Sequence, residues 1–153
     1  RVPLLGTAGI TRVVNGPIPY APDGLPLIGQ MPGVPNAFEA CVFTFGIVQA
    51  GGAGKLLADI MVDGESETDS WAVDPRRFTD HVDHAYATAK AIETYSHEYA
   101  MHFPQIQWPA GRGAKTSPLY DKLAAAGAAF GSYGGWERAD WFPRDGEQAL
   151  PAN

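Results

Sequence analysis

Residues 37–64 read AFEACVFTFGIVQAGGAGKLLADIMVDG, and this stretch decides the fold class. Its first part is apolar or β-prone on both faces up to Gly46, which predicts a short strand over 37–45 buried on both sides. The period then changes to helical spacing, and Asp63-Gly64 is typical of a helix end, because glycine readily adopts the left-handed terminal conformation. The residues with helical spacing are Ala53, Leu56, Leu57, Ile60 and Met61. A strand, a glycine-bearing turn and a helix therefore follow one another, and we predict an α+β protein.

The residues before this unit are rich in turn formers. Residues 1–35 hold seven prolines and six glycines. Proline lacks an amide donor and disfavours a helix at the residue before it, so we expect short edge strands here and no helix. The pair Val13-Val14 is one candidate for such a strand. Pro22-Asp23-Gly24 predicts a tight turn.

The residues after this unit predict a second, mixed helix and strand part. The polar run 65–70 marks the boundary, so we expect one part over 1–64, another over 65–143, and a patternless, disordered tail over 144–153. Asp74-Pro75 predicts a short helical turn, and Ser117-Pro118 predicts a helix that stops at Gly127. Aromatic residues between glycines over 128–142 indicate one or two bent strands.

An amphipathic stripe over 79–97 predicts a further helix whose apolar face belongs to the core. The stripe consists of Val82, Ala85, Tyr86, Ala89 and Ile92, with Tyr99 just beyond it.

Composition limits the functions open to this chain of 153 residues. Eleven Lys and Arg against 17 Asp and Glu give a net charge of −6, which disfavours nucleic acid and anionic membranes as partners. The single cysteine, Cys41, excludes an internal disulfide and a zinc site built from several thiolates. The N-terminus has neither Met nor the shape of a signal peptide, so we expect the chain to begin partway through a longer protein. We expect no nucleic-acid partner, no membrane partner and a cytoplasmic location.

The most informative candidate site is the junction of the predicted strand and helix. A helix N-terminus favours an anionic ligand group, and glycines allow close approach, although a packing role explains the same glycines. The junction is not a phosphate-binding P-loop, because Gln49 and Leu56 occupy positions that this motif reserves for Gly and Ser/Thr. The chain also lacks a G-x-G-x-x-G motif, so a self-contained dinucleotide site is not expected.

Other candidates have simpler interpretations. No cluster of acidic residues completes a metal site around the histidines, which we interpret as solvated or locally paired; they are His81, His84, His97 and His102. Cys41 fits a small hydrophobic residue of the strand, and Glu137 beside Arg138 fits a surface pair of little energetic weight.

Two motif sets resemble a known enzyme family. Residues 13–29 (VVNGPIPYAPDGLPLIG) and 43–54 (FTFGIVQAGGAG) resemble the last segment of the flavin module in dimethylglycine and sarcosine dehydrogenases, of the D-amino acid oxidase superfold. Residues 117–123 (SPLYDKL) and 134–142 (GGWERADWF) are similar to the central domain that follows that module. The two sets occur in the family's order and span about residues 12–143.

This resemblance implies a site and a chemistry. The family oxidises N-methyl amines of glycine by hydride transfer to FAD, the resulting imine yields formaldehyde or a methylene-folate, and the setting is one-carbon metabolism. The resemblance implies that the flavin ring is lined by Thr44, Phe45, Gly46, Ile47 and Val48, and that residues 23–26 shape the turn behind the ring. Asn15 stands where many oxidase relatives have a carboxylate-binding Arg, and no catalytic residue is assigned.

The resemblance also implies what must come from elsewhere. The family's dinucleotide-binding part lies upstream of Arg1, so we expect FAD binding only with that part and no activity of the chain by itself. Folate-binding domains of full-length relatives lie downstream of Asn153. The implied partners are a methylamine substrate and the remainder of the flavin module or a complementary subunit. The alternative is a non-catalytic interaction module that docks through Trp108, Trp136 and Trp141.

Overall fold

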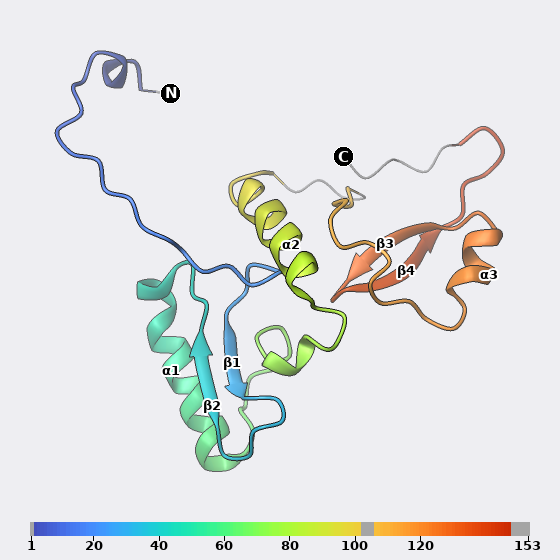
Figure 1. The fold of residues 1–153 in the computed structure, drawn as a ribbon, viewed down its shortest axis with the longest axis horizontal. Coiled ribbons are helices and arrows are strands. Elements are labelled where there is room, and N and C mark those ends of the chain that lie inside the picture. Colours follow the sequence, from blue (N-terminus) through green and yellow to red (C-terminus); the bar gives the residue numbers. More distant parts are fainter. Residues whose placement is uncertain (1, 102–105, 148–153) are drawn as a thin grey trace.

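The computed structural model describes residues 2–101 and 106–147 (Figure 1). These residues form three α-helices, two two-stranded antiparallel sheets and two short 3-10 helices, so the α+β prediction is confirmed. In chain order the elements are η1 (Pro3–Gly6), β1 (Leu27–Gln30), β2 (Phe38–Cys41), α1 (Gly46–Asp63), η2 (Pro75–Arg77), α2 (His84–Ser96), α3 (Tyr120–Ala125), β3 (Ala129–Tyr133) and β4 (Trp136–Trp141).

The first sheet and α1 form one packing unit. β1 and β2 pair with Leu27 opposite Cys41 and Gln30 opposite Phe38. α1 lies along both strands, as Figure 1 shows, and buries Ala53 on the side where Ile28 is also buried. The Pro22-Asp23-Gly24 turn leads into β1 as predicted, with the Gly24 amide donating to the Ala21 carbonyl at 3.0 Å.

The predicted strand over 37–45 is wrong in length and in burial. β2 ends at Cys41, because Val42 takes the left-handed φ of 60° and turns the chain out of the sheet. Its residues are half-buried or exposed, because β1 is the only strand that pairs with β2 among the described residues. A run that is apolar on both faces thus lies here in a sheet that has α1 along both strands and η2 beside β1.

The helix begins earlier than its spacing predicts. α1 starts at Gly46, and the glycines read as a turn lie inside its first turns, where a Cβ on Gly51, Gly52 or Gly54 would meet nothing within 4 Å. The predicted end is confirmed: Gly64 has φ 84° and its amide donates to the Ile60 carbonyl at 3.1 Å. The ion pair of Lys55 with Asp59 also forms on the outer face.

The N-terminal segment differs from its prediction in two details. Residues 3–6 form the 3-10 helix η1 where no helix was expected, and Val13-Val14 belongs to no strand. In Figure 1 this segment runs as an extended arm away from the rest of the molecule. The 3-10 turn contains one proline at its start, where a missing amide costs no hydrogen bond.

The apolar stripe predicted over 79–97 faces inward only in part, because Val82 and Tyr86 are half-buried and its other helical members are exposed. α2 begins only at His84, and Ala85, Ala89 and Ile92 on it are exposed, with Ile92 66% accessible. The buried residues of α2 are Glu93 and Thr94. Glu93 and Thr94 are buried because neighbouring segments provide their hydrogen-bond partners. A buried carboxylate or hydroxyl group needs such a partner, whereas a buried alkyl group does not.

The strands predicted over 128–142 are confirmed, and the structure pairs them as a hairpin. β3 and β4 are antiparallel with Tyr133 opposite Trp136, and both residues of the two-residue turn have positive φ, 57° at Gly134 and 81° at Gly135. This is the type I′ turn that matches the twist of hairpin strands. α3 ends at Gly127 in a Schellman motif, in which the amides of Gly127 and Ala128 donate to the carbonyls of Ala124 and Leu123. Of the tail predicted over 144–153, residues 148–153 lie outside the described residues.

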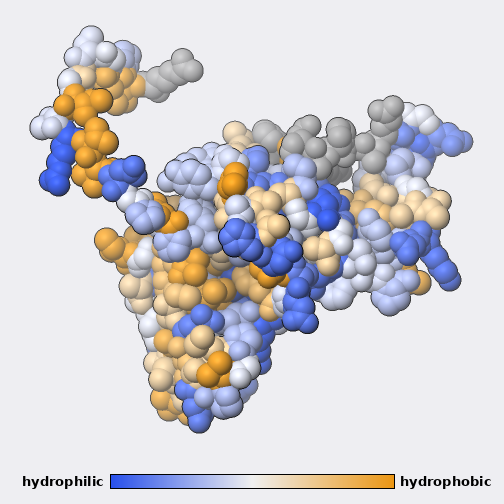
Figure 2. Space-filling model, viewed as in Figure 1, coloured by the Kyte–Doolittle hydropathy of each residue, from blue (hydrophilic) through white to orange (hydrophobic). Residues whose placement is uncertain are grey.

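The hydrophobic core is small. The buried apolar residues of the described chain are Ala21, Ile28 and Ala53. The accessible surface is 11444 Å², whereas a compact monomer of 16.3 kDa exposes about 7500 Å². Figure 2 shows apolar residues gathered at the surface over α1 and along the N-terminal arm. Within the described residues, no helix combines the length and the apolarity needed to cross a bilayer.

Candidate functional site

The flavin-lining residues expected from the sequence form the junction of β2 and α1. Thr44 and Phe45 lie in the turn after β2, and Gly46, Ile47 and Val48 are the first residues of α1. Ile47 is 97% exposed, Val48 82% and Phe45 46%. The junction therefore presents a row of apolar side chains to the outside and is not covered by the chain's own packing.

The N-terminus of α1 is electrostatically open. Its N-cap is Phe45, which offers no side-chain acceptor, and no acidic residue lies in the first turn. The first helical amides have no partner within the helix and concentrate the positive end of the helix dipole. An 18-residue helix thus directs unsatisfied N–H donors toward the apolar row.

Gln49 adds an unsatisfied acceptor to the same turn of helix. Its side-chain oxygen is buried and has no hydrogen-bond partner within the described residues. A buried amide oxygen without a donor costs free energy comparable to a lost hydrogen bond. The first turn of α1 therefore offers free donors, whereas the Gln49 oxygen is enclosed by the chain.

These groups fit one edge of a flavin ring. The isoalloxazine system has flat apolar faces and an N1–C2=O edge that gains negative charge on reduction, which suits an apolar row beside a helix N-terminus. The donor set fits this edge only, because the sequence contains no G-x-G-x-x-G turn for the pyrophosphate.

A second group of contacts fixes the turn in front of β1. Arg77 is 7% exposed and donates to both carboxylate oxygens of Asp23, at 2.7 and 3.0 Å, and to the Leu25 carbonyl at 2.9 Å. The Thr94 hydroxyl donates to the Pro22 carbonyl at 3.0 Å. Spacing could not identify Arg77, because its partner lies 54 residues away; the only local signal is its position after the Asp74-Pro75 helical start.

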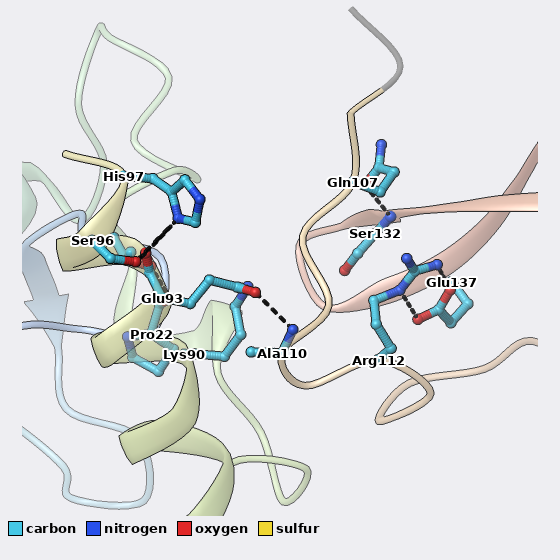
Figure 3. Close-up of polar contacts among 11 residues, drawn as sticks. Pro22, Lys90, Glu93, Ser96, His97, Gln107, Ala110, Arg112, Ser132 and Glu137 are labelled. Atoms are coloured by element: carbon cyan, nitrogen blue, oxygen red, sulfur yellow. Dashed lines mark hydrogen bonds and ion pairs between the residues drawn. The ribbon is translucent and has the colours of Figure 1, made fainter. Parts of the chain in front are cut away.

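Two buried carboxylates hold the segment 106–113 between α2 and the hairpin (Figure 3). Glu93 accepts from the Ala110 amide at 2.7 Å and from Lys90, and Gln107 accepts from the Ser132 amide at 3.0 Å. Arg112 donates to both oxygens of Glu137, at 2.7 and 2.6 Å.

The expectation that Glu137 and Arg138 form a surface pair is wrong. Glu137 is 5% exposed and also accepts from the Gly113 amide at 2.8 Å, whereas Arg138 lies over the Tyr133 ring. Because successive side chains of a strand point to opposite faces, Glu137 and Arg138 lie on opposite faces of the hairpin. The hydrogen bond from Arg112 lowers the pKa of Glu137, so the carboxylate is ionised although it is buried.

The described histidines have local partners. His97 stacks on Trp108 with centroids 4.5 Å apart, and its Nδ1 lies 2.8 Å from the Glu93 carbonyl. His81 contacts Thr79 and Tyr86, and His84 is exposed at the start of α2; His102 lies outside the described residues. Within residues 2–101 and 106–147, no group of three or more His, Cys, Asp or Glu could hold a metal.

Cys41 lies at the end of β2 and is half-buried. Burial, followed by a contact with Glu39, raises the pKa of its thiol. A thiol that is less acidic than usual is a poor nucleophile at neutral pH.

Comparison with known proteins shows which families the sequence of this chain resembles. Residues 63–117 match the family described as the FAD dependent oxidoreductase central domain. The chain is 40% identical over 147 residues to the mitochondrial dimethylglycine dehydrogenase of Homo sapiens, a match that covers 95% of this chain and 17% of that protein. It is 36% identical over 156 residues to the mitochondrial sarcosine dehydrogenase of Mus musculus, covering 98% of this chain and 17% of that protein.

A third relative has a different role. The mitochondrial pyruvate dehydrogenase phosphatase regulatory subunit of Mus musculus is 34% identical over 144 residues, covering 93% of this chain and 16% of that protein. The chain thus spans about a sixth of the length of these relatives. It is a segment related to the dimethylglycine and sarcosine dehydrogenase family.

Proposed function

We propose that this chain forms one wall of the FAD site of an oxidoreductase that oxidises N-methyl amines of glycine, of the sarcosine or dimethylglycine type. The observation that carries the proposal is the open, uncapped N-terminus of α1 beside the apolar side chains of Phe45, Ile47 and Val48. The relatives' names support the substrate class. A dinucleotide-binding part beyond these 153 residues completes the site, and the cytoplasmic location stays a prediction.

In this proposal the chain binds and shields the ring and moves no proton itself. When bound, FAD would supply the redox chemistry, namely hydride acceptance from a methylamine. The first amides of α1 stabilise negative charge at the ring edge, and Ile47 and Val48 exclude water from the ring face. Arg77 holds the turn at Asp23 in place behind the strand that carries the junction.

Complementation with FAD tests the proposal. The chain is mixed with FAD, with and without a protein carrying the dinucleotide-binding half, and the flavin absorbance spectrum is recorded. We expect a perturbed spectrum only with the complement. Flavin bound equally well without the complement, or not bound with it, contradicts the proposal.

Matched substitutions at the two ends of α1 locate the contact. Ile47→Asp places a carboxylate at the ring edge and should weaken flavin binding in the complemented protein by about tenfold or more. Val62→Asp, at the other end of the same helix and 81% exposed, should leave flavin binding unchanged. If the two substitutions weaken flavin binding equally, the ring does not lie at the N-terminus of α1.

A second candidate function is a non-catalytic interaction module. Trp136 and Trp141 are partly exposed on the hairpin, and one relative is named a regulatory subunit. Aromatic side chains of this kind are common anchors of protein interfaces. The same mixing experiment separates the candidates: a stable, monodisperse chain that binds no flavin with or without the complement supports the interaction module.

A further inference from the structure

A cavity of about 380 Å³ lies between the turn at Asp23, the start of α2 and the turn of the β3–β4 hairpin. This volume is in the range of small-molecule sites. None of the flavin-facing residues 44–48 lines the cavity, so an inference about it is independent of the proposed function.

Three polar side chains meet on the wall of this cavity. Tyr86 and Lys90 are one helical turn apart on α2 and both pack on the backbone of Gly111, where a Cβ would lie 2.5 Å from Tyr86 Cε2 and 3.0 Å from Lys90 Cδ. The His81 ring stands edge-on to Tyr86, with centroids 5.3 Å apart. These side chains therefore form one polar patch that contacts the cavity.

Two carboxylates near this patch, those of Asp23 and Glu93, are already bonded, and a third, Asp80, interacts electrostatically with His81. The Asp23 carboxylate pairs with Arg77 through two hydrogen bonds, and Glu93 accepts from Lys90 and from the Ala110 amide. By contrast, neither the Tyr86 hydroxyl nor the Nε2 atom of His81 has a hydrogen-bond partner within the described residues, and Lys90 makes one of its three possible bonds.

Each of the three remaining groups is able to donate a hydrogen bond. Burial, and then the charge of Lys115, lowers the pKa of His81, so its ring is neutral at neutral pH. When the Thr79 hydroxyl donates to Nδ1, at 2.9 Å, the ring proton lies on Nε2. A patch of donors beside satisfied carboxylates suits an anionic acceptor, and a carboxylate accepts several such bonds at once.

The rest of the cavity wall is mainly aromatic. Trp71, Phe78 and Trp108 line it, and flat apolar molecules pack well against such rings. We propose that this cavity is a binding site for a small organic carboxylate with a flat apolar body. The carboxylate bonds to Tyr86, Lys90 and His81, and the body lies against the aromatic side chains.

The test uses the full chain and 4-fluorobenzoate, observed by fluorine NMR, with the neutral 4-fluorobenzamide as the matched probe. The benzoate signal should broaden on titration with the chain, and the benzamide should bind at least about tenfold more weakly. Amide shifts of Gly111, Gly134 and Gly135 should follow the same titration, whereas those of Gly51 and Gly52 on α1 should not move.

Removal of the Tyr86 hydroxyl tests whether the polar patch binds the carboxylate. Tyr86→Phe keeps the ring and should weaken benzoate binding by about three- to tenfold. Tyr99→Phe makes the same change at a residue that is 90% exposed and should have no effect. Amide shifts confined to the neighbourhood of residue 86 verify that the variant is folded.

Several results overturn the proposal. Absence of benzoate binding, equal affinity for the benzamide, or shifts confined to residues outside the cavity each contradict it. Equal effects of Tyr86→Phe and Tyr99→Phe contradict the assigned contacts, and the shift mapping decides the location without any variant. Flavin complementation does not enter these measurements, so failure here leaves the flavin proposal standing.

Discussion

Individual buried charges, more than apolar side chains, connect distant segments of this chain. Arg77 joins the turn before β1 to η2, and Glu137 joins β4 to the segment at Arg112 and Gly113. Each carboxylate accepts at least two hydrogen bonds, which offsets its loss of hydration. Such residues are costly to replace singly, because the partner is then buried without compensation.

The substitution Glu137→Gln tests how much one buried charge contributes to the stability of the fold. The substitution keeps the shape but removes the charge opposite Arg112, so we expect the free energy of unfolding to fall by about 2 kcal/mol. Urea unfolding monitored by tryptophan fluorescence measures it. Asp59→Asn, in the exposed pair with Lys55, is the control and should change the free energy by less than about 0.5 kcal/mol. Equal losses in the two variants would show that Glu137 contributes no more than a surface charge.

The pKa of Glu137 also predicts a pH dependence. Because the hydrogen bond from Arg112 lowers this pKa in the folded state, the stabilisation is complete above the unfolded value, near pH 4.3, and is lost as the pH falls through the folded value. Asp74 acts in the same direction through its hydrogen bond from Arg76. Stability should therefore decline below about pH 4. The decline should be shallower in Glu137→Gln, and an unchanged slope in that variant would rule out Glu137 as a source.

At the scale of elements, the ends of the helices have different roles. In α1, α2 and α3 the amide of the C-cap residue donates to a carbonyl of the last turn, and α2 also begins with the side-chain cap Asp83, which accepts from the Tyr86 amide. α1 has Phe45 as its N-cap residue and no side-chain cap. An uncapped start on the longest helix lowers stability and leaves donors for a ligand.

Phe45→Ser should reveal this trade-off. The serine hydroxyl caps α1, so we expect the chain to gain about 0.5–1 kcal/mol in unfolding free energy while flavin binding in the complemented protein weakens. Leu119→Ser makes the same change at the other uncapped N-cap, that of α3, and should leave flavin binding unaffected. Stronger flavin binding by Phe45→Ser would contradict the role given to the open helix end.

At the scale of the whole molecule, the accessible surface exceeds what a compact monomer carries. The excess is roughly 4000 Å² of polar and apolar surface together. The apolar residues are spread over α1, the outer face of α2 and the N-terminal arm. We infer that these surfaces are covered when the protein acts.

Sedimentation velocity tests this inference. The chain should associate as its concentration rises, and the dinucleotide-binding half that completes the flavin site should suppress the association. Ile47→Ser combined with Val48→Ser should also reduce it, whereas Lys55→Ser on the polar face of α1 should not. If the chain stays monomeric at every concentration, the inference that a partner buries its exposed apolar surface is wrong.

Backbone signals were predictable from the sequence because they depend on a few neighbouring residues. The turn at Gly24, the ends at Gly64 and Gly127 and the helical start at Asp74-Pro75 all formed where the sequence places them. Each needs only a residue tolerant of left-handed φ or a side chain that caps its own helix. The proposal that residues 44–48 line the flavin came from motif resemblance and not from these signals.

The sequence by itself determined the α+β composition and the places where the chain turns, because steric limits on φ and ψ act within a few residues. Only the tertiary structure decided which side of α2 is buried, which arginine pairs with which carboxylate, and that α1 packs along both β1 and β2. A buried polar group is stable only beside a partner, and that partner is defined only when distant segments meet.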